Sequence, residues 1–333
     1  MNSYKVLNRQ TFSRGEYSLV PIRFEDRMII MNWRNEQIYH LRQTGSLTEE
    51  DQNNYFNNVV SILFDQEKPQ QILFSYLKNE ECIGYGGLVH INWIDKNAEI
   101  SFIMNTILEK DFFEFHWKNY LLLLQEIAFN EIGLHKIYTY AFDLRPRLYV
   151  ALQEAGFKHE ATLKQHCRFN GKYMDVLIHS SINQLKLRKA SLRDLETTFK
   201  WAINNEVRKY SFNSNSIAKE EHISWFEQKL QDKTCLYLIL ENSLNFPLGS
   251  IRIDMKENNN GIISYLIDPL YHGRGYGKIM LSLLEIYIRE NAIPIEHLIG
   301  FVMENNIASI HIFEALGYTK SKDKNDLKFI KEL

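Results

Sequence analysis

The sequence has little cysteine, little proline and no long apolar run. Its 333 residues include only 3 Cys and 6 Pro. Three scattered cysteines without a C-x-x-C pair exclude a disulfide scaffold and the usual zinc spacings, so we expect free thiols and no metal site. No apolar run approaches the roughly 20 residues that cross a bilayer, and the first residues lack the apolar core of a signal peptide. We therefore expect a soluble, cytoplasmic chain with no membrane contact.

The sequence also lacks an excess of charge of either sign. The formal net charge is −2, with 39 Lys and Arg against 41 Asp and Glu. No overall positive field exists to hold a nucleic acid, so we expect no nucleic-acid partner. Hydrophobic residues make up 45% of the chain, an ordinary value for a globular protein. A chain of this length favours two domains.

Landmarks of the first half return in the second half in the same order. Trp201 follows Trp33 by 168 positions, and Gly317 follows Gly156 by 161. Between them lie paired strand-like and helix-like segments, namely Ile83–Ile91 with Leu248–Met255, Ala98–Met104 with Gly261–Ile267, Phe115–Ile132 with Tyr276–Asn291, and Ala151–Phe157 with Ile312–Tyr318. Such self-similarity indicates two copies of one fold.

The boundary between the copies is expected where the strand-like segment Tyr173–Ile182 ends and KLRKA begins, which gives domains 1–184 and 185–333. In residues 278–288, Ile279, Leu283, Ile286 and Tyr287 recur at spacings of three and four, which is typical of an amphipathic helix. The expected fold class is mixed α/β (α+β). Each domain would be a twisted mixed sheet with helices on both faces.

The strongest chemical signal is a glycine-rich loop that opens a helix. A strand runs into Asp268-Pro269, and Gly273, Gly275 and Gly277 then alternate before a helix begins. Glycine lets successive amides turn inward, and free amides at a helix start favour a phosphate or diphosphate. An ordinary tight turn is the alternative. The spacing fits neither the dinucleotide fingerprint nor a Walker loop.

This loop resembles the acyl-CoA diphosphate loop of the GNAT superfamily of N-acetyltransferases. The family pattern Q/R-x-x-G-x-G/A reads His272-Gly273-Arg274-Gly275-Tyr276-Gly277 here, with His in the Gln/Arg place. A second family landmark, an Asn before the last helix and a closing Gly-aromatic pair, appears as Asn306 and Gly317-Tyr318. The resemblance implies acetyl-CoA as cofactor. It would be held by Leu266, Ile267, His272, Gly273, Arg274, Gly275, Tyr276, Gly277, Lys278, Asn306 and Ser309.

The resemblance implies direct attack of an amine on the thioester, where two parallel strands splay apart and leave backbone groups on the Leu266 strand unpaired. Many family members place a Tyr seven residues after the Asn as the acid. That position is Phe313 here, so the acid is not identified. His222, Glu206 and Asp254 are the candidate bases, and His is favoured because its ordinary pKa lies near neutral pH. A structural or solvated role is the alternative for each of them.

The segments 201–208, 210–212 and 221–226 are similar to the substrate-side helices of acetyltransferases that act on UDP-linked 4-amino-4,6-dideoxy sugars, as in pseudaminic acid synthesis. Arg208 and Arg252 would then pair with a diphosphate, and Tyr210 or Trp225 would stack on a base or sugar. The alternative is that these residues belong to the core or the surface.

The expected partner is accordingly a small-molecule amine, with a UDP- or dTDP-amino sugar as the leading acceptor. An amino acid, a polyamine, an antibiotic and a protein N-terminus remain alternatives, as does a non-catalytic acyl-CoA or sugar-nucleotide binder.

The first copy has no glycine where the loop should fall. Bulky Phe113, Phe115 and Trp117 and acidic Asp111 and Glu114 lie there instead, which predicts that this copy does not bind CoA in the usual manner. The alternative is an altered site built on Lys118 and Arg145, the latter at the position of the Asn. A scaffold, a second sugar site and a regulatory domain all remain open for this copy.

Overall fold

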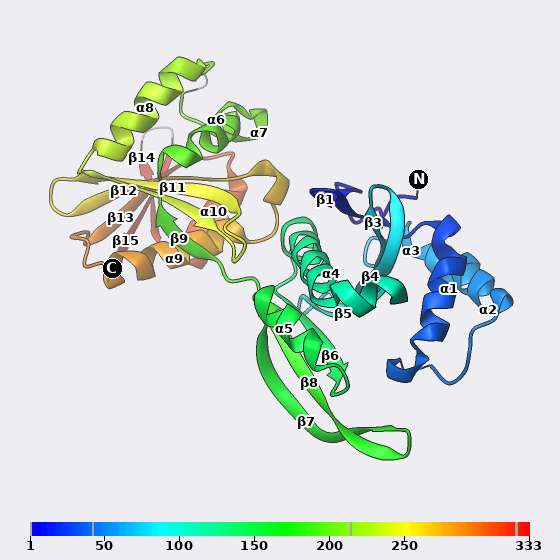
Figure 1. Cartoon of the computed structure of the whole chain (residues 1–333). Helices are drawn as coiled ribbons and strands as arrows, with labels where there is room; N and C mark the ends of the chain where they lie inside the picture. The colour runs from blue at the N-terminus through cyan, green and yellow to red at the C-terminus, as the bar shows by residue number, and fades with distance from the viewer. Residues whose placement is uncertain (1, 42, 214, 324–325) are drawn as a thin grey trace. The chain divides into compact units, whose positions relative to one another are not determined.

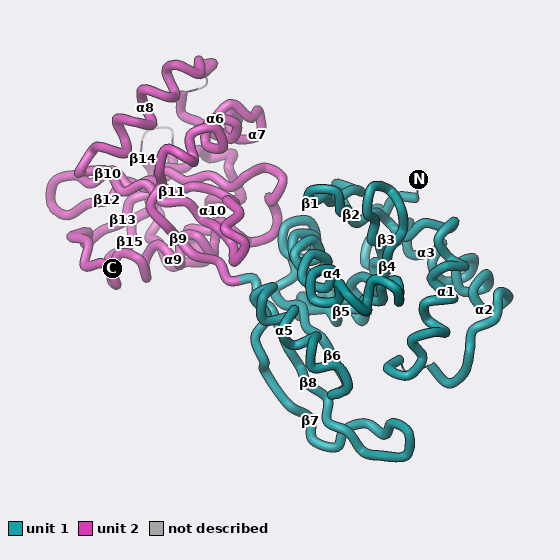
Figure 2. Tube along the Cα trace, in the orientation of Figure 1, with its two compact units in different colours: residues 1–183 teal, residues 184–333 magenta. Residues whose placement is uncertain are grey.

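The computed structural model describes residues 2–41, 43–213, 215–323 and 326–333. The chain divides into two compact units, Met1–Asn183 and Gln184–Leu333 (Figure 2). This division falls one residue before the expected boundary. Each unit is described by itself below.

The first unit is built on an eight-stranded sheet in the order β1-β2-β3-β4-β5-β6-β8-β7. Its one parallel pair in the described residues is β5–β6, and the other neighbouring strands are antiparallel. The strands are β1 (Phe12–Arg14), β2 (Tyr17–Pro21), β3 (Ile72–Lys78), β4 (Glu81–Asn92), β5 (Asn97–Met104), β6 (Lys136–Phe142), β7 (Lys158–Phe169) and β8 (Lys172–Ile182).

Helices cover both faces of this sheet, with α1 and α2 on one side and α4 on the other (Figure 1). The longest, α4, continues as a π-helical stretch over Ile127–Ile132. The α-helices are α1 (Arg27–Glu36), α2 (Glu49–Tyr55), α3 (Ser61–Leu63), α4 (Thr106–Glu126) and α5 (Pro146–Glu154).

The strands β7 and β8 form a long hairpin that reaches beyond the rest of the first unit in Figure 1. Asn170 and Gly171 make its turn, with φ of 46° and 79°. Asn-Gly is the dipeptide that a two-residue hairpin turn favours, because both central residues need positive φ. The sequence therefore carried a signal for β7 that our reading did not use.

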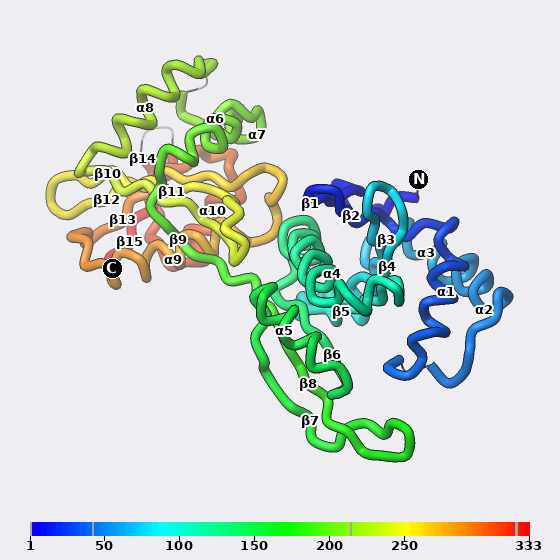
Figure 3. The backbone as a smooth tube through the Cα atoms, in the orientation of Figure 1, coloured from blue at the N-terminus to red at the C-terminus, as the bar shows by residue number. Residues whose placement is uncertain are grey.

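The second unit has a seven-stranded sheet in the order β14-β15-β13-β12-β11-β10-β9, with β12–β13 as its parallel pair. Its path is traced in Figure 3. The strands are β9 (Lys186–Lys189), β10 (Cys235–Glu241), β11 (Pro247–Lys256), β12 (Asn260–Ile267), β13 (His297–Met303), β14 (Thr319–Asp323) and β15 (Asp326–Glu332). The α-helices are α6 (Leu195–Ile203), α7 (Asn205–Arg208), α8 (Lys219–Gln231), α9 (Tyr276–Glu290) and α10 (Ile307–Ala315).

Helices α6 and α8 lie over one face of this sheet and α9 over the other (Figure 1). The buried stripe of α9 includes Met280, Leu284 and Ile288, four residues apart. Of the four residues predicted for the apolar face, Leu283 and Tyr287 are partly buried and pack against the core, whereas Ile279 and Ile286 are exposed. One side of the helix is buried and the other exposed, as expected. Apolar residues also occur on the exposed side, so the sequence pattern alone did not identify the buried one. The expected fold, two tandem mixed sheets with helices on both faces, is confirmed.

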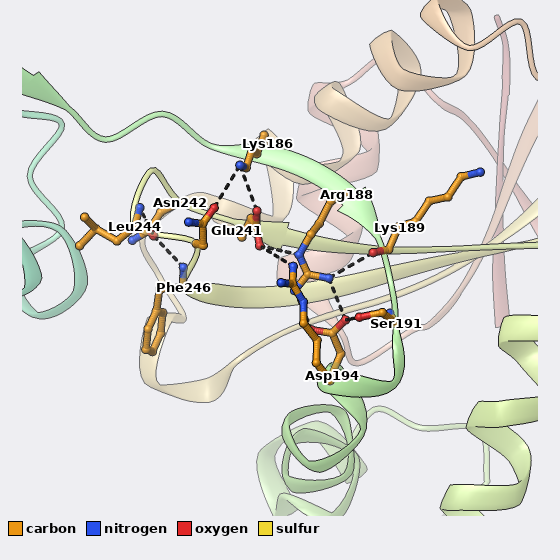
Figure 4. Close-up of polar contacts among 11 residues, drawn as sticks. Lys186, Arg188, Lys189, Ser191, Asp194, Glu241, Asn242, Leu244 and Phe246 are labelled. Atoms are coloured by element: carbon orange, nitrogen blue, oxygen red, sulfur yellow. Dashed lines mark hydrogen bonds and ion pairs between the residues drawn. The ribbon is translucent and has the colours of Figure 1, made fainter. Parts of the chain in front are cut away.

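A cluster of ion pairs joins β9 to β10, its neighbour in the second sheet (Figure 4). Arg188 donates to both oxygens of Asp194, at 2.7 and 2.6 Å, and its Nε donates to Glu241 at 2.5 Å. Lys186 approaches Glu241 from the solvent side at 3.1 Å. Asp194 and Glu241 are both buried, and Arg188 pairs with both of them, while Arg193 approaches Glu241 at 3.9 Å as a further cation.

Candidate active site

The two parallel strands of the second unit separate partway along their length. The pairing of β12 with β13 runs from Asn260–His297 to Ile263–Gly300 and then stops. Both strands continue, to Ile267 and to Met303, while β12 stays paired with β11 over its whole length. A gap therefore opens beside residues 264–267, as the family resemblance implied.

The alternation of the ladder determines which backbone groups face the gap. The Asp268 amide donates to Leu248 on the β11 side, whereas the Asn259 carbonyl accepts from His297 on the β13 side. Because successive residues of a strand point their backbone groups to opposite sides, Tyr265 and Ile267 face the gap. Leu266 faces β11, opposite Ser250. Leu266 lines the cavity described below, but the backbone groups directed to the gap belong to its two neighbours.

The glycine loop lies between the end of β12 and the start of α9. Gly273 and Gly275 have φ of 75° and 82°, a region that side chains with a Cβ disfavour. The first backbone hydrogen bond of α9 runs from Ile279 to Gly275. Across the described residues, the amides of Gly273, Gly275 and Gly277 donate to no other backbone group. These are the orphan donors of a helix start, turned toward an open cavity.

Of the charged and aromatic residues predicted in and beside the loop, two line the cavity and two do not. His272 Nε2 lies 2.9 Å from the Ile267 carbonyl, which fastens the loop to the end of β12. Tyr276 is buried and lines the cavity. Arg274 stacks over the Tyr271 ring at 5.2 Å, and neither Arg274 nor Lys278 is among the cavity-lining residues. The loop amides, rather than these two cations, form the cavity wall.

Asn306 caps α10, and its Oδ1 accepts from the Ser309 amide at 3.1 Å. The Ser309 hydroxyl lies 2.9 Å from the hydroxyl of Tyr265, which extends from β12. Phe313 is buried, with its ring 6.1 Å from that of Tyr265. Burial raises the pKa of Tyr265. Tyr265 was not among the residues we predicted, although it alternates with Ile263 and Ile267 in the strand pattern.

One cavity of about 720 Å³ joins these parts. Its wall includes the glycine loop, the diverging ends of β12 and β13, and the N-terminus of α10. An unsatisfied amide cradle at one end and unpaired strand groups in the middle match a ligand with a diphosphate and an amide-bearing arm. The residues present therefore fit coenzyme A.

The structure separates the three candidate bases. Glu206 is exposed and lines the cavity. His222 is buried against Phe226 and lies 3.2 Å from the Thr198 hydroxyl, outside the cavity wall, and burial lowers its pKa. Asp254 pairs with Lys229 at 2.7 Å and with Arg252 at 3.0 Å. Burial alone would raise the pKa of Asp254, but these two cations outweigh it and the pKa is lowered.

The predicted substrate residues divide in the same way. Tyr210, Trp225 and Arg252 line the cavity, and the Arg252 guanidinium lies 5.2 Å from the centre of the Trp225 ring. Arg208 does not line it, because its guanidinium donates to the carbonyls of Asn213 and Asn215. Phe212 and His311 also line the cavity and were not among the predicted site residues, although Phe212 lies in the segment 210–212 that carried the substrate-side resemblance.

The first unit keeps the gap but not the loop. Pairing of β5 with β6 stops at Glu99–Tyr138, while β5 continues to Met104. Helix α4 then begins after a single residue, Asn105, and its one break is at Phe112. Helix therefore occupies the stretch where the second unit has its glycine loop.

The opening between β5 and β6 leads into a cavity of about 540 Å³. Arg145, at the N-cap of α5 as Asn306 is at that of α10, lines it and pairs with Glu109 at 3.4 Å. Burial and the Arg145 charge lower the pKa of the adjacent His40 to about 3. Lys118 pairs with Glu154 at the surface and does not line this cavity.

Two family models match the chain, both described as an acetyltransferase (GNAT) domain. One matches residues 19–178 and the other residues 184–319, so together they cover most of the sequence. The chain thus belongs to the GNAT acetyltransferase family and contains its domain twice. Acetyltransferases of this family use acetyl-CoA, which confirms the expected enzyme class and cofactor.

Individual relatives are distant. An uncharacterised protein of Methanocaldococcus jannaschii is 27% identical over 153 residues, which is 45% of this chain and 31% of that protein. The chain thus spans about a third of this curated relative. A crystal structure of a domain from M. jannaschii is 25% identical, with a TM-score of 0.41, over 45% of this chain and 99% of that one. Spermidine N-acetyltransferase from Vibrio cholerae, in complex with CoA and spermine, is 21% identical, with a TM-score of 0.44, over 51% and 96%.

Within the described ranges, no group of three or more His, Cys, Asp or Glu side chains is arranged to hold a metal ion. In the same ranges, no helix is both long and apolar enough to cross a membrane.

Proposed function

We propose that the second domain transfers the acetyl group of acetyl-CoA to a primary amine on a nucleotide-linked amino sugar. The observation that supports this most directly is the continuity of the cavity. It runs from the amides of the glycine loop, past the gap in β12–β13, to aromatic side chains of the segment that follows α7 and of α8. Donor and acceptor would share one continuous cavity, which is the positioning that direct transfer requires.

The residues of the chain would each do a definite task. The amides of Gly273, Gly275 and Gly277 would hold the diphosphate. Acetyl-CoA, when bound, supplies the acetyl group as a thioester. The backbone groups of Tyr265 and the amide of Ile267 would hold the pantetheine arm, while the Ile267 carbonyl stays bonded to His272. One of the two amides would stabilise negative charge on the thioester oxygen. Asn306 would keep the N-terminus of α10 in place at the edge of the cavity.

Glu206 is the base that this arrangement favours. Of the three candidates, it alone lines the cavity among the described residues. Asp254 is held by two cations, and His222 is packed between aromatic rings. Glu206 would take the proton from the ammonium form of the acceptor before attack.

The charge of the cavity wall favours a nucleotide sugar over a polyamine. Among the described lining residues Glu206 is the only carboxylate, and Arg252 lies in the same wall. A polycationic acceptor would need several carboxylates, whereas a diphosphate is suited to a guanidinium. Tyr210, Phe212 and Trp225 add aromatic faces on which a base or sugar ring could stack.

The test is release of free thiol from acetyl-CoA by the full chain. The acceptors are UDP- and dTDP-linked amino sugars, spermidine, lysine and a peptide with a free N-terminus. We expect turnover with a nucleotide amino sugar. Turnover with spermidine alone would refute the sugar assignment. Binding of acetyl-CoA without turnover of any amine would make the protein a non-catalytic acyl-CoA binder.

A further inference from the structure

We propose that Tyr265 supplies the proton taken up by the departing thiolate, in place of the tyrosine that position 313 lacks. This inference rests on the proposed function of the second domain. It concerns one hydroxyl group, and its test is designed to be read separately from that function.

Position 313 has no room for a phenol in this packing. Phe313 is buried and stacks on Phe329, with ring centroids 5.1 Å apart. The tip of its ring points at Gly300 on β13, where a Cβ would lie only 2.4 Å from Phe313 Cζ. An oxygen added at Cζ would be crowded by that strand. The packing of the core therefore excludes a tyrosine, and hence an acid, at position 313.

The Tyr265 hydroxyl is the proton donor that the neighbouring structure offers instead. Tyr265 lies on the part of β12 that has separated from β13, and its side chain lines the cavity beside Phe313. Its hydroxyl bonds to Ser309 at 2.9 Å, and Asn306 in turn accepts from the Ser309 amide. The phenol is thus held from the same helix terminus that carries the family asparagine.

The first copy provides an internal comparison. The strand Ala98–Met104 of the first copy corresponds to Gly261–Ile267 of the second. Phe102 is therefore at the position equivalent to Tyr265. Phe102 has no hydroxyl and stacks on Tyr120 with centroids 3.8 Å apart. The phenol is present in the copy that has the glycine loop and absent from the copy that lacks it. If the ring only packed against the sheet, a phenylalanine would be sufficient, as Phe102 is in the first copy. Packing alone therefore does not explain the hydroxyl of Tyr265.

In the proposed step, one proton moves from the Tyr265 hydroxyl to the departing sulfur. The amine nitrogen forms the new C–N bond, and the C–S bond breaks with its electron pair left on sulfur. The Tyr265 O–H gives its proton to that sulfur. The phenolate, stabilised by the Ser309 hydroxyl, regains through water the proton that the nitrogen loses as the amide forms. Glu206 has already taken the proton of the ammonium form before attack. Burial raises the pKa of Tyr265, because it disfavours the charged phenolate.

The test uses the full chain with Tyr265→Phe, and Tyr318→Phe as the control. Tyr318 is also buried beside Phe313, its hydroxyl has no partner within the described residues, and it does not line the cavity. We expect Tyr265→Phe to lower kcat about 10²-fold, near the lower end for a general acid because a thiolate leaves readily. Tyr318→Phe should leave kcat unchanged.

A second readout does not depend on turnover, namely the pKa of the thiol of bound CoA, followed by thiolate absorbance. Donation from Tyr265 favours the thiolate, so Tyr265→Phe should raise this pKa by about one unit while the Kd for CoA at low pH stays the same. An unchanged thiol pKa and unchanged kcat in Tyr265→Phe would overturn the inference. Failure of the unmodified protein to bind CoA would instead overturn the proposed function.

Discussion

The indole nitrogen of Trp201 donates a hydrogen bond of 2.8 Å to Oδ2 of Asp268. Oδ1 of the same carboxylate accepts from the Leu270 amide at 3.0 Å. Asp268 is the first residue after β12, so this one side chain joins helix α6 to the beginning of the glycine loop. The position at which the loop leaves the sheet is thus coupled to α6.

Trp201→Phe should therefore destabilise the second domain by about 1.5–3 kcal/mol, the range for a lost hydrogen bond to a charged group. Calorimetry of the full chain, with and without acetyl-CoA, would identify the affected transition, since a ligand raises the transition of the domain that binds it. Trp93→Phe is the control, because Trp93 donates a similar bond, 2.9 Å, to Pro69 in the first unit. Equal effects of the two variants on the ligand-sensitive transition would contradict this account.

Gly275→Val should weaken CoA binding at least tenfold, about 1.4 kcal/mol, because a β-branched residue at φ of 82° forces the loop to shift. Gly317→Val is matched to it, with φ of 78° at the end of α10 and no place in the cavity wall. Both variants should lose about 1–3 kcal/mol of stability from strain. Only the first should change the Kd measured by titration calorimetry, and retained affinity in Gly275→Val would refute the placement of the diphosphate.

The full chain should bind one CoA, not two. In the first unit α4 begins one residue after β5, and the Arg145 guanidinium is already paired with Glu109. Titration calorimetry should give a stoichiometry near one for the unmodified chain and no binding of the original affinity for Gly275→Val. A residual site of similar affinity in that variant would support the altered site in the first copy.

Glu206→Gln should lower kcat by about 10²-fold or more at neutral pH, the effect of removing a general base. The amide keeps the size of the side chain, so KM for acetyl-CoA should stay close to its original value. Glu220→Gln is the control, an exposed glutamate on α8 that does not line the cavity. Full activity of Glu206→Gln would remove Glu206 as the base.

Arg188→Gln should cost about 3–5 kcal/mol, because it leaves the buried Asp194 without its cation and removes from Glu241 its nearest one. Lys186→Gln removes a half-exposed partner of the same Glu241 and should cost less than about 1 kcal/mol. Urea unfolding of the full chain measures both. Equal costs would show that Arg188 is not the residue that neutralises the cluster.

The cluster also has a pH signature. Burial alone would raise the pKa of Asp194, but its bonds with Arg188 outweigh burial and lower the pKa. A lowered pKa contributes stability above the unfolded value of about 3.9, and that contribution is lost as pH falls through the folded value. The difference between the unmodified protein and Arg188→Gln should therefore shrink in acid. A difference that stays constant down to pH 2 would contradict it.

The sequence predicted the features that depend on local pattern. The strand preceding the loop, the helix beginning at Tyr276 and the cap at Asn306 lie where they were expected. Features set by contacts between distant segments were not predictable in the same way. His222 has the chemistry of a base, but packing of α6 against α8 buries it. The backbone groups that face the gap follow from the register of β12 with β11, which no motif reveals.

The opening between the parallel strands has a consequence for how duplicated copies diverge. In both units the pairing ends after a few residues, whether or not a glycine loop follows. The gap is thus a property of the paired strands, and the glycine loop is a separate feature of the eight residues between β12 and α9. A duplicate can shed its donor by mutations confined to that connection. It then keeps the cavity between the strands, which can change its ligand independently of the original reaction.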